Sequence, residues 1–260
     1  QMILLITIGL FVRDFAKAKK LGNEEGLHYR YQNIGIFTGL LFGGFLATNF
    51  DYEFVFIVAS SVLIFAFVYF YRKHTIEQHP AIINQKKISQ YSLGHNVKEF
   101  FSNKERAKAY IMTVGLMLWF GFKYLYVPLY ILRSGYLDSM SGLVLAVSIL
   151  PLIFFEVKVG NYADRQGMHK PIAFGFLIIA ITNLIIFFNP LHLVNFFLIA
   201  CVNLGSSMIE PLQETLLFKN LSEEREEDLY GIYMTADPVA YFLAPLIGAV
   251  ILFFLPFKFL

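Results

Sequence analysis

Long uncharged stretches dominate the pattern of polar and apolar positions along the chain. Five of them cover residues 31–50, 54–71, 139–155, 171–209 and 238–257. Each reaches or approaches the roughly 18–20 residues with which a helix crosses about 30 Å of hydrocarbon. The core of a soluble enzyme rarely needs helices of this length. The pattern therefore predicts a membrane protein built from transmembrane helices.

Three details refine the predicted spans. The stretch 171–209 is nearly twice one span, and Asn-Pro-Leu-His at 189–192 predicts a tight hairpin within it. The stretch 109–132 is interrupted only by Lys123 and adds another candidate. The apolar run at the start is too short to cross a bilayer, so we interpret both chain ends as truncations. The expected helices are a remnant at 1–12, then 33–50, 53–71, 109–132, 139–159, 171–188, 192–217 and 231–255.

The composition also indicates that the chain is surrounded by lipid. Hydrophobic residues make up 57% of the 260 residues and charged residues only 15%, whereas a soluble domain has about a quarter charged. The net charge of +2 is too small to indicate a nucleic-acid partner. The single Cys201 and the dispersed histidines form no disulfide framework and no metal-ligand spacing. We therefore expect no metal and no cofactor.

The basic residues predict which side of the membrane each loop faces. Of the 21 Lys and Arg, all but Lys123, Arg133 and Lys258 lie in one alternating set of connections. By the positive-inside rule this set is cytoplasmic. The predicted cytoplasmic loops are 13–30, 72–108, 157–171 and 218–230.

The segment 72–108 is the only long polar connection. We interpret it as a cytoplasmic linker, in which Val97, Phe100 and Phe101 could place a short amphipathic helix on the membrane surface. The linker divides the chain into an N-terminal part, 1–71, and a C-terminal helical bundle, 109–260.

The two parts share a weak internal repeat. At a spacing of 202 positions, four residues of 23–47 are identical to residues of 224–252: Glu24, Glu25, Leu27 and Tyr31 match Glu226, Glu227, Leu229 and Tyr233. Both copies lead from the predicted cytoplasm into an apolar span, as parallel-repeated transporter halves require. Chance similarity of two acidic segments is the alternative.

Together these features resemble the major facilitator superfamily over nearly the whole chain. The segment 157–171 is similar to the superfamily's loop signature G-x-x-x-D-R-x-G-R-[RK], with a basic residue one place late. The matching residues are Gly160, Asp164, Arg165, Gly167 and Lys170. The resemblance implies a conformational role for this loop. It also implies that the chain runs from about helix four to helix eleven, so that 1–71 holds helices four to six and 109–260 helices seven to eleven.

The 33–50 span resembles the superfamily's antiporter signature G-x-x-x-G-P-x-x-G-G through Gly35, Gly39, Gly43 and Gly44. Leu40 replaces the proline of that signature, which contributes to a helix bend. Close helix packing at small residues explains the same spacing in any membrane protein. These glycines therefore predict either an efflux signature or a packing face.

Charges inside predicted spans mark candidate transport residues, because each costs on the order of 2.5–3.5 kcal/mol to insert at the bilayer centre. Trp119, Lys123, Tyr126 and Tyr130 follow at helical spacing and predict one face of a wet central cavity. Interfacial aromatics and packing are the alternative for this stripe.

Three carboxylates are candidate proton sites. Glu210 and Glu214 share one helix face beside Pro211, and Asp237 precedes Pro238 about two turns inside the last predicted helix. Burial favours protonation of such groups, which suits proton coupling. Alternatively, Glu214 lies near the headgroups and Asp237 caps a helix.

The sequence thus predicts an all-α, polytopic bundle of the major facilitator type with two pseudo-symmetric halves. No phosphate-binding loop or catalytic motif is present in the sequence, so we expect no enzyme and transport driven by an ion gradient rather than ATP. Proton-coupled efflux of a small amphipathic compound is the first hypothesis. Uptake of a sugar, organic acid or other metabolite is the second, and a non-transporting receptor or scaffold the third. We expect a monomer in the cell membrane, which would be the inner membrane in a prokaryote.

Overall fold

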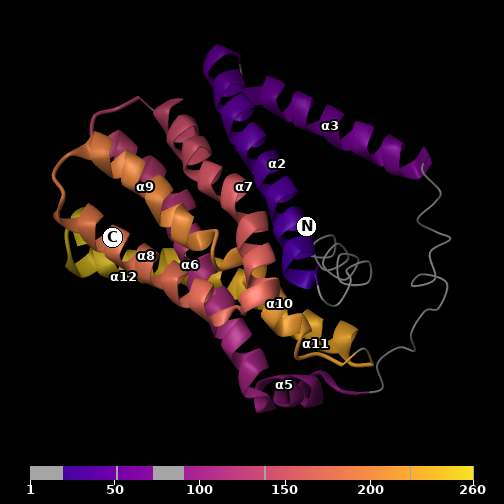
Figure 1. The fold of residues 1–260 in the computed structure, drawn as a ribbon. Coiled ribbons are helices and arrows are strands. Elements are labelled where there is room, and N and C mark those ends of the chain that lie inside the picture. Colours follow the sequence, from indigo (N-terminus) through magenta and orange to yellow (C-terminus); the bar gives the residue numbers. More distant parts are fainter. Residues whose placement is uncertain (1–19, 51, 73–90, 138, 223, 260) are drawn as a thin grey trace.

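The computed structural model describes residues 20–50, 52–72, 91–137, 139–222 and 224–259 as a helical bundle, with no strand in this part of the chain (Figure 1). The predicted remnant at 1–12 and most of the predicted linker lie outside the described residues. The helices are α2 Leu21–Asn49, α3 Tyr52–Arg72, α5 Leu93–Ser102, α6 Lys104–Arg133, α7 Ser139–Gln166, α8 His169–Phe188, α9 His192–Ser206, α10 Glu210–Phe218, α11 Glu226–Tyr233 and α12 Ala236–Phe254. A short 3-10 turn, Phe257–Phe259, follows α12.

Within the described residues, five helical stretches are long and apolar enough to cross a membrane. They are α6, α7, α8, the pair α9 and α10, and the pair α11 and α12. Outward-facing apolar side chains such as Phe154, Phe174 and Phe242 are exposed on these helices, as expected for side chains that meet lipid. The prediction of an all-α transmembrane bundle is confirmed.

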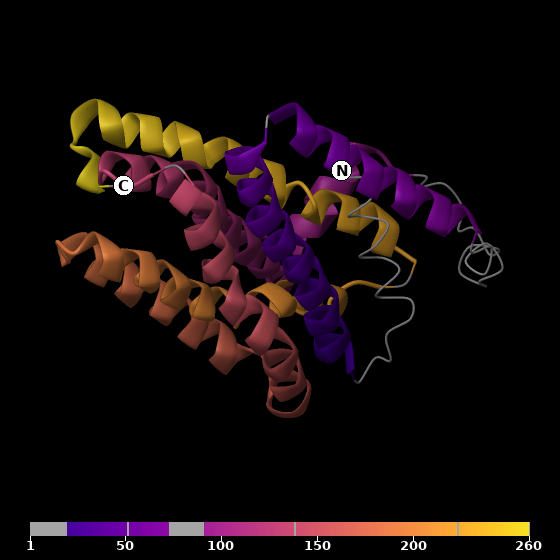
Figure 2. The same cartoon turned by 90° about the horizontal axis from the view of Figure 1, so that it is seen from above.

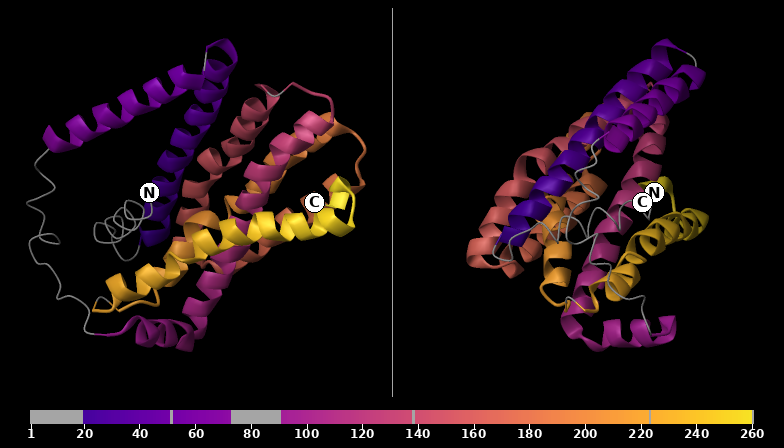
Figure 3. Two further views of the ribbon diagram at one scale, coloured as in Figure 1. Left: turned by 180° about the vertical axis from the view of Figure 1, so that it is seen from behind. Right: turned by 90° about the vertical axis from the view of Figure 1, so that its right-hand side faces the viewer.

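The long helices pack in pairs around α6 and α7. From above, α12 lies on one side of α6 and α7, and α8 and α9 lie on the other (Figure 2). The view from behind shows α12 crossing α6, with α3 extending away from the bundle beyond α2 (Figure 3). The N-terminal part therefore meets the C-terminal bundle through α2.

Helix α2 packs along α7 at two very close approaches. A Cβ on Gly22 would lie 2.8 Å from the Gly160 carbonyl oxygen, and one on Gly26 would lie 2.8 Å from that of Glu156. Such distances are shorter than real Cβ contacts, so glycine is required where the two backbones touch. Further along, a Cβ on Gly44 would lie 3.7 Å from Gly142. The contact thus extends over most of α2.

Two spans are broken rather than continuous. Ser207–Met208–Ile209 separates α9 from α10, so the helix predicted over 192–217 is interrupted just before Pro211. Met234 and Thr235 separate α11 from α12, because Pro238 in the first turn of α12 cannot donate to a preceding carbonyl. Asp237 therefore lies in the first turn of α12, and its predicted position two turns inside one continuous helix is wrong.

The connections at the basic end of the molecule, where α5 lies, are shorter than predicted. Helix α7 runs to Gln166 and ends where Gly167 adopts a φ of +94°, and α8 begins at His169. The predicted loop 157–171 is thus mostly helix. Residues 21–30 likewise belong to α2, and α11 begins at Glu226. The reason is that these helices continue past their apolar spans and pack on one another.

The amphipathic helix expected in the linker is α5, and it packs against protein. Phe100 is fully buried in the main core, while Val97 and Phe101 are exposed, so the three side chains do not form one membrane-facing cluster. Asn103 caps the next helix by accepting hydrogen bonds from the backbone N–H groups of Glu105 and Arg106. This cap fixes the corner between α5 and α6.

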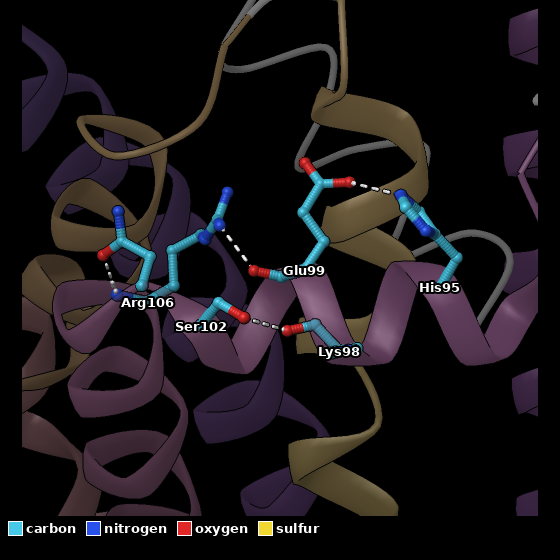
Figure 4. Close-up of a pocket in the computed structure, with 6 residues that line it drawn as sticks. His95, Lys98, Glu99, Ser102 and Arg106 are labelled. Atoms are coloured by element: carbon cyan, nitrogen blue, oxygen red, sulfur yellow. Dashed lines mark hydrogen bonds and ion pairs between the residues drawn. The ribbon is translucent and has the colours of Figure 1, made fainter.

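Ionic contacts hold α5 against α11. Arg225 donates to Glu99 at 2.7 Å, to Asn96, and to Asp228 within its own segment. These bonds hold the pKa of Glu99 below its ordinary value. His95 lies 3.7 Å from the same carboxylate, and His95 and Glu99 both line a pocket of about 470 Å³ at the corner between α5 and α6 (Figure 4).

Candidate functional site

Asp164 binds the first turn of α2. Its two carboxylate oxygens accept hydrogen bonds from the backbone N–H groups of Gly22 at 3.0 Å and Asn23 at 2.9 Å. An anion at this position also interacts favourably with the positive end of the helix dipole. Of the predicted loop motif, Gly160 supplies the close approach to Gly22 and Asp164 supplies this cap. Arg165 and Lys170 are exposed.

Lys123 is buried in the middle of α6. Its side chain is 1% exposed, and its ammonium nitrogen lies 4.4 Å from the ring centre of Phe120 and 4.6 Å from that of Tyr124. Nζ has no hydrogen-bond partner among the described residues, and Glu210 lies near enough to attract it electrostatically. The nearby carboxylate and the two ring faces are the features that offset the burial of this cation.

Glu210 belongs to a pair of buried carboxyl groups. Its carboxyl group lies within hydrogen-bonding reach of that of Glu156 on α7, which also accepts a bond from the Asn33 side-chain nitrogen at 2.9 Å. Oε2 of each of the two glutamates has no other hydrogen-bond partner among the described residues. A hydrogen bond between two carboxyl groups requires a proton on one of them. Lys123, Glu210, Glu156 and Asn33 thus bring together a cation, a proton-sharing pair and an amide from four helices. We call them the carboxyl-pair site.

Glu214 lies one turn further along α10, in a different environment. It accepts a hydrogen bond from the Tyr29 hydroxyl at 2.9 Å, and Gln213 donates to the same hydroxyl at 3.3 Å. Glu25 of α2 lies near enough to Glu214 to repel it. The structure therefore assigns the two predicted glutamates of α10 to separate clusters.

Asp237 is partly buried at the start of α12. It interacts electrostatically with both Glu210 and Glu214, although no hydrogen bond joins it to either within the described chain. Its position beside both clusters follows from the break between α11 and α12.

A cavity of about 760 Å³ lies between α6 and α12 on one side and α8 and α9 on the other. The predicted stripe of α6 lines it: Trp119, Lys123, Tyr126 and Tyr130. At the end of the cavity opposite α5, Tyr130 contacts His192 at 2.8 Å and accepts from the Asn195 side chain at 2.9 Å. The cavity lining is mainly aromatic and aliphatic, with a smaller number of polar groups.

The glycines of the antiporter-like signature do not all pack. In the described part of the chain nothing lies within 4 Å of a Cβ placed on Gly35, Gly39 or Gly43, whereas Gly44 meets Gly142. The predicted packing face is therefore seen only at Gly44. Close helix approach is found instead at Gly22 and Gly26.

Sequence reasoning missed Glu156, Asn33 and Glu25 as site residues. Glu156 directly follows the apolar stretch 139–155 and was expected at the end of a span, and Glu25 was expected in a loop. Both are fully buried. The available signal was the continuation of helical spacing past the apolar stretch, which keeps Glu156 on the buried face of α7.

The transmembrane helical bundle agrees with what comparisons to known proteins show. The chain is 23% identical over 239 residues to an uncharacterized MFS-type transporter of Methanocaldococcus jannaschii. This match covers 90% of the chain and 60% of that protein, so the chain spans about three fifths of its relative's length. No solved structure matches the chain. The family model described as Major Facilitator Superfamily matches residues 3–257, and the chain belongs to the major facilitator superfamily.

Proposed function

We propose that the protein is a secondary active transporter that moves a small molecule by alternating access, coupled to protons, with efflux as the favoured direction. The observation that carries the proposal is the carboxyl-pair site, in which Lys123, Glu210 and Glu156 are all buried within apolar helices. Intramembrane ionisable groups are costly, and their usual use is ion or substrate movement.

The carboxyl pair supplies a place for one exchangeable proton. Glu156 and Glu210 together hold a proton while they remain in contact, and Lys123 balances the remaining negative charge. A movement of α7 relative to α10 would separate the two carboxyl groups and change their affinity for that proton. Because α2 packs along α7 and Asn33 binds Glu156, movement between the two halves would be transmitted to the pair. This is the physical basis that we propose for coupling.

The aromatic stripe supports an amphipathic substrate. Trp119 and Tyr126 line the cavity of about 760 Å³, whose volume lies in the range of small-molecule sites. Lys123 reaches the same cavity, and this observation favours the second candidate, uptake of an organic acid whose carboxylate would bind the ammonium group. The sign of charge on the substrate separates the two candidates.

The proposal also includes the predicted orientation, oligomeric state and correspondence to the helices of the superfamily. We propose that the basic end faces the cytoplasm, that the protein works as a monomer, and that 1–71 and 109–260 correspond to helices four to six and seven to eleven of the superfamily, joined by the linker 72–108. We also propose that it is not an enzyme. Asp237, beside both carboxyl clusters, is the further candidate for proton transfer.

The proposal is tested in membrane vesicles with an imposed pH gradient. The probes are ethidium, an amphipathic aromatic cation, and a short dicarboxylate as the organic-acid alternative. We expect Glu210→Gln to abolish gradient-driven movement of the transported probe while exchange at equal pH continues. Glu105→Gln, which changes an exposed glutamate on α6, is the matched control. Failure of both probes to respond to the gradient, or normal gradient-driven transport by Glu210→Gln, would contradict proton coupling.

The charge pairing of Lys123 gives an independent test by thermal unfolding in detergent. Removing one member of a buried pair leaves the other charge uncompensated, at a cost of about 3–5 kcal/mol. We expect Lys123→Leu to lower the unfolding temperature more than the double variant Lys123→Leu/Glu210→Gln. A double variant less stable than Lys123→Leu would show that Lys123 and Glu210 are not paired.

A further inference from the structure

A second group of buried acids lies where α2 meets α10, nearer the basic end than the carboxyl-pair site. From α2 it contains Glu25, His28 and Tyr29, and from α10 it contains Gln213 and Glu214. Glu25 is 0% exposed and Glu214 is 5% exposed. Tyr29 and Glu214 lie 185 positions apart in sequence and meet only through tertiary packing. We call this group the latch cluster.

The latch cluster has more acceptors than donors. Both carboxylate oxygens of Glu25 and Oε2 of Glu214 lack a hydrogen-bond partner among the described residues. The nearest base, His28, places Nδ1 3.6 Å from Glu25, too far for a good hydrogen bond. Tyr29 donates its only proton to Glu214. The geometry therefore leaves two buried carboxyl groups in one cluster with one imidazole nearby.

Among the residues that the structure describes, the surrounding helices add acids and tyrosine hydroxyls but no further base in direct reach. Tyr230 of α11 lies within hydrogen-bonding reach of Glu214, and Tyr233 of α11 and Asp237 of α12 interact with it electrostatically. Glu210 of α10 acts on His28. The other buried cation, Lys123 of α6, interacts with Glu210, which already contacts Glu156 of α7. One imidazole cannot neutralise both Glu25 and Glu214, so a closed interface needs a proton on at least one of them.

We propose that Glu25 and Glu214 form a proton-binding latch that holds α2 against α10 at the basic end. With a proton bound, the carboxyls tolerate burial and the helices stay closed, as in this structure. When the proton is lost, repulsion and the demand for hydration favour separation of the helices, which gives the carboxylates access to water. This site is separate from the carboxyl pair and makes closure of one entrance depend on pH.

The position of the latch explains why it would act on closure. The same end of α2 is held by Asp164 through Gly22 and Asn23, and Leu21 packs into the main core, which also contains Leu216 and Leu217 of α10. Opening at this end would therefore expose Leu21, which is 5% exposed in the closed form. A cysteine at position 21 reports on the latch directly.

The test uses Leu21→Cys in a background with Cys201→Ser, in detergent, so that both faces are accessible. Labelling by a maleimide is measured at pH 5.5 and 8.5, and each rate is divided by that of the denatured protein to remove the titration of the thiol itself. We expect the labelling rate to be at least about tenfold higher at pH 8.5. The loss of one proton can change the ratio of closed to open molecules by up to about tenfold per pH unit, and the two buffers differ by several units. In Glu25→Gln/Glu214→Gln we expect low labelling at both pH values.

Two further variants separate a latch from ordinary packing. Glu24→Gln changes the neighbouring acid on α2 and should keep the response of the unmodified protein. Tyr29→Phe removes the hydroxyl that donates to Glu214, so the pH at which labelling changes should move. Equal labelling at both pH values, a response that survives in the double Gln variant, or an unmoved transition in Tyr29→Phe would overturn the proposal.

The readout requires neither a substrate nor transport. If Leu21→Cys follows pH as expected while no probe responds to a pH gradient, the proposed function fails and the latch stands. If gradient-driven transport occurs while labelling ignores pH, the latch fails and the proposed function stands.

Discussion

Replacing Asp164 by Asn should shift the balance between closed and open forms at the basic end. The carboxylate accepts backbone hydrogen bonds from both Gly22 and Asn23, and an amide can accept only through its oxygen. One charge-assisted bond, worth about 1.5–3 kcal/mol, is therefore lost. The carboxylate's interaction with the dipole of α2 adds about 0.3–1 kcal/mol at such partly exposed positions.

Taking about 2 kcal/mol for the total, because Asp164 is partly exposed, the ratio of closed to open molecules should fall about thirtyfold. The protein should remain folded, since the core does not include this carboxylate. The prediction thus concerns populations and not stability of the whole bundle.

Spin labels on Arg30→Cys and Lys219→Cys, both exposed positions on or beside α2 and α10, would measure these populations by pulsed electron resonance. We expect Asp164→Asn to increase the long-distance population strongly and Asn161→Ala, an exposed site one turn earlier on α7, to leave it unchanged. A distance distribution in Asp164→Asn equal to that of the unmodified protein would refute the conformational role of the motif.

Two other predictions follow from the same end of the molecule. Gly160→Ala should separate α2 from α7 and increase maleimide labelling of Leu21→Cys, because the added methyl would lie 2.0 Å from the Gly22 carbonyl oxygen; unchanged labelling would show that the helices adjust at no cost. The docking of α5 should weaken in acid. The folded-state pKa of Glu99 is lowered by Arg225, so this stabilisation is present above the ordinary carboxyl pKa of about 4.3 and is lost as pH falls through the lowered value. Proteolysis between α5 and α6 should accelerate over that acidic range, and Arg225→Gln should be cut readily even at neutral pH; equal protection in both proteins would contradict this.

The fold could be predicted from the sequence because a helix that crosses lipid must be apolar over the whole length of the span. Uncharged stretches of span length can be counted directly, and the Asp164 motif could be read because it is short and local. The same reasoning placed Trp119, Lys123 and Tyr126 on one helix face, and the structure brings all three to one cavity. Their role in transport stays a prediction.

The carboxyl clusters could not be predicted because tertiary packing creates them. Nothing in the sequence pairs Glu156 with Glu210 or Glu25 with Glu214, which come from different helices. Counting charges also placed Glu25 in a loop before the apolar stretch 31–50, and Glu156 at the end of a span, directly after the apolar stretch 139–155. Burial of these residues depends on Gly22, Gly26 and Gly160, which let α2 approach α7 closely enough to cover them.

The central claim is that Glu156 and Glu210 share an exchangeable proton within the membrane. Infrared difference spectroscopy of the reconstituted protein tests it most directly, because a protonated carboxyl group has a C=O stretch separate from that of a carboxylate. In a Glu25→Gln/Glu214→Gln background, which removes the carboxyls of the latch cluster, we expect a protonated-carboxyl band in acidic buffer that disappears with rising pH. Adding Glu210→Gln should remove most of this band, while adding Glu105→Gln should keep it. A spectrum without a titrating band, or a band of full size after Glu210→Gln is added, would contradict the account.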